Sequence, residues 1–210
     1  MKTIIAFIVV VLSGLHLSAQ SQAEAFIKEA QQYLTQKNYK QATLSLQDAI
    51  NDINTLIAGQ ISEALPAEIN GLKADSDSEI NATAMGMMGG GMQISKTYQH
   101  PTKRENQAQL QILANSPMLA SINMFMSNPA MMGEGYKSVR VGTRRAILKS
   151  EMDDYYDDNG TSKKIRSSEL QLPLNQTLIT INMKGFASEA EELAFAGKLD
   201  IDKLSTLLEN

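Results

Sequence analysis

The stretch ATAMGMMGGGMQ, residues 82–93, carries side chains that could bind a metal ion. It holds four methionines among four glycines, and a histidine follows it; the candidate ligands are Met85, Met87, Met88, Met92 and His100. Thioether sulfur is a soft ligand that selects soft ions such as Cu(I). These residues are therefore one hypothesis for a Cu(I) or Ag(I) site, provided that several of the sulfurs converge.

The same loop also supports an interpretation without a metal. Its glycines leave it without a preset geometry, and ordering such a chain costs roughly 1–2 kcal/mol per residue. Methionine is flexible and polarizable, which suits adaptable contact surfaces as well as gaps in a core. We therefore favour a flexible connector whose four methionines contact a partner, with the metal site as the alternative.

A cluster of carboxylates precedes Asn159-Gly160, and its members are Asp153, Asp154, Asp157 and Asp158. Carboxylates are the ligands that Ca²⁺ prefers. In an EF-hand register with Gly160 at position six, however, Tyr155 and Arg166 fall at ligand positions one and twelve. The pattern favours a solvated hairpin loop with an Asn-Gly turn.

A locally basic region overlaps this cluster and consists of Arg140, Arg144, Arg145, Lys149, Lys163, Lys164 and Arg166. On one face of a sheet it could meet an anionic partner. Strand alternation, however, places neighbours such as Arg144 and Arg145 on opposite faces. We favour a solvated sheet face paired with the acidic loop.

Residues typical of an active site are scarce. The chain has no cysteine and two histidines, and His100 precedes Pro101 in an expected turn. The sequence contains no HExxH, Gly-x-Ser-x-Gly or phosphate-binding glycine motif. We expect no enzyme activity, no catalytic residue and no cofactor, and we rank a carboxylate-based hydrolase as a third alternative.

The first 19 residues have the features of a secretory signal peptide. Lys2 supplies positive charge, residues 4–12 are uniformly apolar, and Ala19 precedes an expected cleavage site. No later stretch approaches the roughly 20 apolar residues of a membrane span. A net charge of −4 gives no general attraction for nucleic acid. The sequence predicts an exported protein, periplasmic or secreted.

Apolar spacing predicts an N-terminal hairpin of two helices, over residues 22–37 and 39–64. In the second helix, apolar residues recur at helical spacing at Ala42, Leu46, Ala49, Ile50, Ile53, Leu56 and Ile57. Residues 66–92 are rich in Gly, Ser and Asp and predict a connector leading into the Met/Gly loop. Within it, we expect Ile69, Leu72 and Ile80 to contact the core.

From residue 93 the pattern changes to strands. Alternation predicts strands over 93–100, 106–114, 169–174 and 177–183, with two more that turn at Gly142-Thr143. Capping residues predict a helix from Ser116 to Asn128 and two helices over 188–196 and 200–208. This order is typical of an α+β domain, an antiparallel sheet of about six strands with helices packed on a face. The expected organisation is a signal peptide (1–19), a helical hairpin (20–65), a connector with the loop (66–92) and an α+β domain (93–210).

Several short motifs resemble an uncharacterised family of exported bacterial proteins, namely LPAEINGLKAD, MMGGG, SKTY, SPML and SNP. The resemblance covers about residues 62–208. It implies a leucine-proline segment with a glycine, a Met/Gly loop and a small α+β domain, and it implies no particular activity. The element order is also similar, more distantly, to the PsbP/Mog1 type of sandwich.

These patterns favour a non-enzymatic binding protein. We expect it to contact a protein partner in the cell envelope through the helical hairpin and the Met/Gly loop, and we expect no nucleic-acid partner. Binding of a soft metal by the loop is the alternative function.

Overall fold

The computed structural model of the chain describes residues 22–75, 91–116, 119 and 133–209. The expected signal peptide, most of the Met/Gly loop and most of the helix expected at 116–128 lie outside the described residues. The chain forms two compact units, Met1–Ile50 and Asn51–Asn210, and the boundary between them falls inside a helix.

The first unit is a helical hairpin, which confirms the prediction. α1 (Gln22–Thr35) leads into a tight turn in which Lys37 has a φ of 57°, and α2 (Tyr39–Ala64) follows. The Asn38 N–H closes the turn by donating to the Tyr33 carbonyl at 2.8 Å. Small buried side chains form the interior of this hairpin, and they are Ala23, Ala30, Ala42, Ser45 and Ala49.

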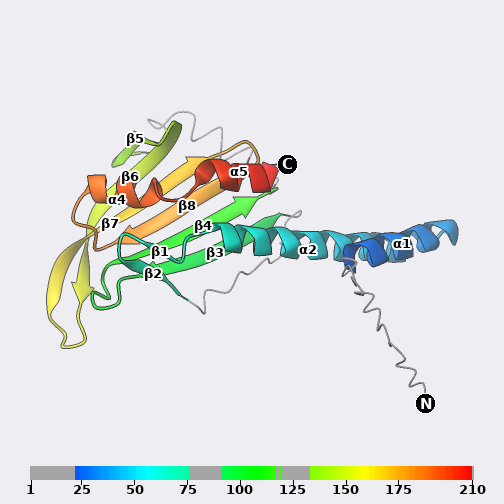
Figure 1. Cartoon of the computed structure of the whole chain (residues 1–210), viewed down its shortest axis with the longest axis horizontal. Coiled ribbons are helices and arrows are strands. Elements are labelled where there is room, and N and C mark those ends of the chain that lie inside the picture. The colour runs from blue at the N-terminus through cyan, green and yellow to red at the C-terminus, as the bar shows by residue number, and fades with distance from the viewer. Residues whose placement is uncertain (1–21, 76–90, 117–118, 120–132, 210) are drawn as a thin grey trace, which may run out of the picture. The chain divides into compact units, whose positions relative to one another are not determined.

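The second unit contains one antiparallel sheet of eight strands in the order β1-β2-β3-β4-β8-β7-β6-β5 (Figure 1). The strands are β1 (Glu68–Ile69), β2 (Leu72–Ala74), β3 (Met92–Gln99), β4 (Gln107–Ala114), β5 (Tyr136–Val141), β6 (Arg144–Tyr156), β7 (Ser162–Pro173) and β8 (Thr177–Lys184). β8 pairs with both β4 and β7, so the last strand joins the two halves of the sheet.

The α+β class is confirmed, but the expectation of about six strands is wrong. The two additional strands, β1 and β2, lie in the segment expected to be a connector. They join at Asn70 and Gly71, whose φ values are 50° and 84°. Asn-Gly with two positive φ values is the preferred two-residue hairpin turn. Strands of two and three residues are too short to show alternation, so periodicity missed them. Ile69 and Leu72 are buried, as expected, and Ile80 lies outside the described residues.

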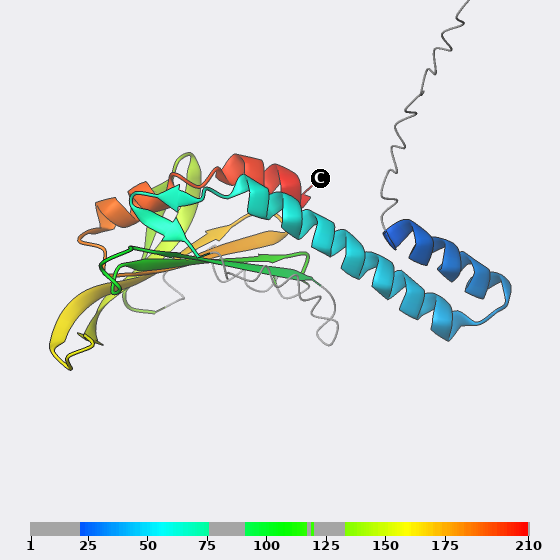
Figure 2. The ribbon, with the colours of Figure 1, turned by 60° about the horizontal axis from the view of Figure 1, so that its bottom comes forward.

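Two helices and the end of α2 cover one face of the sheet (Figure 2). α4 (Glu189–Ala196) and α5 (Ile201–Glu209) begin where the sequence predicts. The Ser188 hydroxyl caps α4 by accepting from the Glu191 N–H, and the Asp200 carboxylate accepts from the Lys203 N–H at 3.0 Å. None of the described helices is long and apolar enough to cross a membrane.

The core between sheet and helices consists of alternate strand residues. Leu110 of β4 faces Ile181 of β8, which in turn faces Leu170 of β7, and all three are almost fully buried. Phe195 of α4 packs edge to face on Tyr98 of β3, with the ring centroids 5.6 Å apart. Because alternate residues belong to this core, the residues between them point to the opposite face, where Leu119 packs on Ile147 and Leu178 in a second, smaller cluster.

Tyr98 makes the stability of this core sensitive to alkaline pH. Its side chain is fully buried, and its hydroxyl donates to the Pro66 carbonyl at 3.0 Å. Burial raises the pKa of Tyr98 to about 12, whereas tyrosine in an unfolded chain ionises near 10. Between about pH 10 and 12 only the unfolded state has released this proton, so the free energy of unfolding falls as pH rises.

We therefore expect Tyr98→Phe to reduce this fall by about 2–3 kcal/mol over that interval, while costing about 1 kcal/mol at pH 8 through the lost hydrogen bond. Urea unfolding at several pH values from 8 to 12 measures both effects. Tyr156→Phe is the control, because the Tyr156 side chain is exposed. Parallel pH curves for the two variants would contradict the assignment to Tyr98.

Candidate functional site

The structure does not bring the candidate metal ligands Met92 and His100 together. Met92 is the first residue of β3 and is buried, whereas His100 follows the end of the same strand. Eight residues of strand separate their backbones by about 26 Å, so one ion cannot bind both. His100 Nδ1 instead accepts from the Thr102 and Lys103 N–H groups at 3.3 and 3.2 Å.

The other three methionines of the loop, Met85, Met87 and Met88, lie outside the described residues. Within the part of the chain that the structure describes, no group of three or more His, Asp or Glu residues could hold an ion. A soft-metal site at those three sulfurs stays a prediction.

The predicted hairpin loop lies between β6 and β7, but it contains only Asp157 and Asp158 of the four acidic residues. Asp157 Oδ1 accepts from the Asn159 and Thr161 N–H groups at 3.0 and 2.8 Å, and Gly160 has a φ of 77°. Asp153 and Asp154 belong to β6 itself, because this strand is longer than expected. The carboxylate of Asp157 is therefore used by the turn.

The basic region does not form one patch, and its partners come from several elements. The ion pairs are Arg144–Asp202, Lys149–Glu151, Lys163–Glu105, Lys164–Asp154 and Arg166–Glu192. Only Lys164 pairs with a member of the predicted acidic cluster. The expectation that the acidic loop neutralises this region is therefore wrong for the other four, because α4, α5, β6 and the β3–β4 turn supply their carboxylates.

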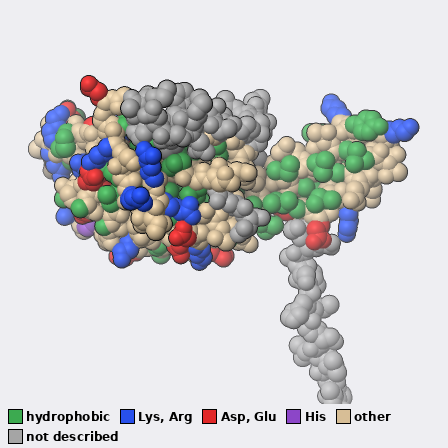
Figure 3. Space-filling model, turned by 90° about the horizontal axis from the view of Figure 1, so that it is seen from above, with side chains coloured by type: hydrophobic (Ala, Val, Ile, Leu, Met, Phe, Trp, Pro, Cys, Tyr) green, Lys and Arg blue, Asp and Glu red, His purple; other side chains and the backbone are tan. Residues whose placement is uncertain are grey.

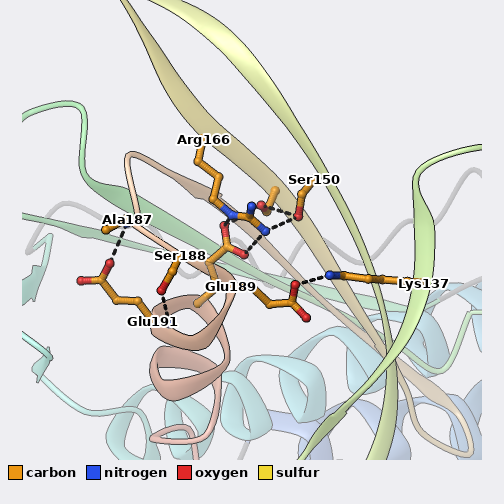
Figure 4. A network of polar contacts seen from close by, with 9 residues as sticks. Lys137, Ser150, Arg166, Ala187, Ser188, Glu189 and Glu191 are labelled. Atoms are coloured by element: carbon orange, nitrogen blue, oxygen red, sulfur yellow. Dashed lines mark hydrogen bonds and ion pairs between the residues drawn. The ribbon is translucent and has the colours of Figure 1, made fainter.

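One of these pairs is buried and forms the polar network shown in Figure 4. Glu192 of α4 is fully buried and accepts from Arg166 Nε and Nη2 at 2.8 and 3.0 Å. Ser168 donates to the same carboxylate at 2.5 Å, and Arg166 also donates to Ser150 at 2.7 Å. The hydrogen bond to Glu192 raises the pKa of Arg166.

This network joins α4 to β6 and β7, and its carboxylate has no exposed surface, whereas the Arg166 side chain is 24% exposed. Every polar atom of the carboxylate has a hydrogen-bond partner. Such a group holds a helix in place on the sheet. Sequence reasoning missed it, since nothing near Glu192 in the chain indicates that its partners lie more than twenty residues away.

On the face opposite to the main core, β3, β4 and β8 carry mostly polar, uncharged side chains, apart from Leu113 and Leu178 at one end. Strand register places amide and hydroxyl side chains there: Gln93, Ser95, Thr97, Gln107, Gln109, Gln111, Thr180 and Asn182. Two depressions of about 330 and 410 Å³ share Lys184 on this face. These groups could form hydrogen bonds with a polar ligand.

The helical unit presents the most distinctive surface of the molecule. Of the ten large apolar side chains that are exposed among the described residues, eight belong to α1 and α2. Within the first unit, five of them share one side of the hairpin: Ile27, Leu34, Tyr39, Leu46 and Ile50. Figure 3 shows hydrophobic side chains gathered along this helical unit. We call these five residues the apolar side.

Helical geometry explains why they lie together. Ile27, Leu34 and Leu46 each follow a buried alanine by four residues. A residue four positions after an interior residue is rotated by about 40° around the helix axis. Because the two helices are antiparallel and face each other, this rotation points to the same side of the hairpin on both. The opposite side carries Glu29, Gln41 and Asp48.

The apolar stripe seen in the sequence of α2 is thus divided between interior and surface. Ala42 and Ala49 are buried, whereas Leu46 and Ile50 are 44% and 49% exposed. An interior of alanine and serine lets the two helices approach closely but buries little apolar area, and isolated short helices are marginal in water. The hairpin therefore leaves its larger side chains available to a partner.

No family model and no curated protein matches the chain. A solved structure from Bacteroides thetaiotaomicron is similar over 60% of this chain and 40% of that chain, with a TM-score of 0.42 and 11% sequence identity. The chain thus matches less than half the length of that protein.

Proposed function

We propose that this is an exported, non-enzymatic protein that acts by binding a protein partner through the apolar side of its helical hairpin. The observation that carries the proposal is the row of exposed Ile, Leu and Tyr side chains beside an alanine interior. Contiguous apolar patches of a few hundred Å² on a protein surface mark interaction sites.

The energetic gain of covering this side is substantial. Full burial of an Ile, Leu or Tyr side chain contributes about 1.5–3 kcal/mol, and these five are between 39% and 65% exposed. A partner that covers all five would therefore gain on the order of 5 kcal/mol before the cost of association. A partner helix that packs on this side, as the third helix of a bundle, would bury these five side chains.

Two further expectations from the sequence accompany this proposal. Met85, Met87 and Met88 of the Met/Gly loop remain a second proposed contact, with soft-metal binding as the alternative. The expectation that Met92 contacts a partner is wrong, because its side chain is buried in the core. The resemblance to an uncharacterised family of exported bacterial proteins supports the proposed location in the cell envelope.

Affinity capture with tagged protein tests the proposal. We expect Leu46→Ser to reduce the amount of co-captured protein at least tenfold, because this substitution removes a side chain from the middle of the apolar side. Leu44→Ser is the matched control: Leu44 is 50% exposed on the same helix and points about 160° away from Leu46. Equal capture by the two variants, both folded by circular dichroism, would refute the proposed function.

A further inference from the structure

We propose that the apolar side of the hairpin pairs with the same side of a second copy of this chain, the two hairpins running antiparallel to each other. This inference rests on the proposed function, because it names the partner of the same surface. Two hairpins joined in this way form a four-helix bundle, in which the large apolar side chains of both copies become the core.

The charges of the hairpin favour a second copy as the partner. From residue 30 to residue 47 the charged residues are Lys37 and Lys40, both near the turn between the helices. The other end carries three acids against one lysine, namely Glu24, Glu29, Asp48 and Lys28. The hairpin is therefore basic at one end and acidic at the other, and Figure 3 shows basic side chains, which are lysines in this part of the chain, at one end of the helical unit.

These charges also select the direction of pairing. An antiparallel pair places the lysine end of each copy beside the acidic end of its partner. The attraction acts along the length of the bundle, because Glu29 and Asp48 lie on the side turned away from the contact. A parallel pair would bring four lysines together at one end and six acids together at the other. Both arrangements are isologous contacts about a two-fold axis, so the charges and not the symmetry favour the antiparallel one.

The positions of the apolar residues agree with the antiparallel arrangement. Tyr39 lies near the turn and Ile50 lies eleven residues further along α2. In an antiparallel pair centred on the apolar side, Tyr39 of one copy is opposite Ile50 of the other. The two Tyr39 residues are then about 16 Å apart along the bundle.

The size of the surface predicts a weak dimer. Two helices of about 20 Å length and about 10 Å width offer a patch of roughly 400 Å². Stable interfaces bury about 800 Å² per partner, so this contact has about half the area of a standard interface. We expect dimerisation that depends on protein concentration in the micromolar range.

Sedimentation velocity of residues 20–210, from about 1 to 500 µM, tests for the dimer. We expect the weight-average mass to rise toward that of a dimer, and we expect Leu46→Ser to weaken dimerisation at least tenfold, because a symmetric contact loses this side chain twice. Leu44→Ser should leave the mass curve unchanged. A monomer throughout the range, or a dimer insensitive to Leu46→Ser, would overturn the inference.

The chain contains no cysteine, so introduced cysteines report the direction of pairing without background. A disulfide requires Cα atoms within about 7 Å of each other. A mixture of Tyr39→Cys and Ile50→Cys chains should therefore form mixed disulfide dimers under mild oxidation, whereas Tyr39→Cys alone should form few. Efficient self-crosslinking of Tyr39→Cys would overturn the antiparallel arrangement.

The two proposals can fail separately. If the protein stays monomeric but Leu46→Ser still abolishes capture of a different protein, the second copy is excluded and the proposed function stands. If neither self-association nor capture depends on Leu46, both are refuted.

Discussion

Replacing Glu192 with alanine is expected to lower the free energy of unfolding by about 3 kcal/mol. The substitution leaves the Arg166 guanidinium, whose side chain is only 24% exposed, without its carboxylate. It also removes one of the two partners of the buried Ser168 hydroxyl, which keeps its hydrogen bond to Ser150 at 2.9 Å. A largely buried guanidinium that keeps only Ser150 as a partner loses most of what compensates its desolvation. Urea unfolding at neutral pH measures the loss.

The matched control is Glu189→Ala in the same helix. Glu189 also forms an ion pair, with Lys137, but the two side chains are 33% and 49% exposed. Exposed ion pairs contribute only about 0–1 kcal/mol. The double substitution Arg166→Met with Glu192→Leu should recover much of the loss, since apolar side chains can replace a buried ion pair. Similar losses for Glu192→Ala and Glu189→Ala would show that the buried network does not hold α4.

Replacing Gly185 with alanine is expected to lower the free energy of unfolding by about 3–4 kcal/mol, through two separate effects. Gly185 has a φ of 73°, a conformation that strains any residue with a Cβ by about 1–2 kcal/mol. A Cβ at this position would lie 2.4 Å from the Glu105 carbonyl oxygen and 2.7 Å from its carbonyl carbon. Both contacts are with backbone, so the turn that follows β3 must move away from the end of β8.

Gly160→Ala separates the two effects. Gly160 has nearly the same φ, 77°, but no heavy atom lies within 4 Å of the position that its Cβ would take. We expect this variant to lose only about 1–2 kcal/mol, which is the backbone strain alone. Denaturant unfolding of both variants gives the steric contribution as the difference. A difference near zero would mean that the close approach of Gly185 to Glu105 is relieved without cost.

These two sites lie in the sheet unit, whereas the proposed binding surface lies in the helical unit. Neither Glu192 nor Gly185 belongs to the apolar side, so their variants test how the sheet unit is held together. The variants of Leu46 and Leu44 change exposed residues and should alter stability by about 0.5 kcal/mol or less. Loss of binding can therefore be distinguished from loss of fold.

Local patterns in the chain determined most of the elements. The helical hairpin, the strands from residue 92 onward and the two C-terminal helices follow from apolar spacing and from capping residues such as Ser188 and Asp200. The far ends of β6 and β7 do not, because β7 begins at Ser162 and not near the predicted residue 169. These signals act over a few residues, because helix ends and strand alternation are satisfied locally. The antiparallel α+β class follows from the order of those elements.

The tertiary structure alone decided which apolar residues of α2 are buried and where the charged residues find their partners. Spacing showed that Ala42, Leu46 and Ile50 share one stripe, but the angle at which α1 approaches buries the alanine and exposes the other two. The pairing of Glu192 with Arg166 depends on how α4 crosses the sheet, which no short stretch encodes. For the Met/Gly loop, the structure separated Met92 from His100 because one strand lies between them. Within the predicted hairpin surface, only the structure shows which side chains are exposed, since exposure depends on the contacts between elements and is not a property of the residue type.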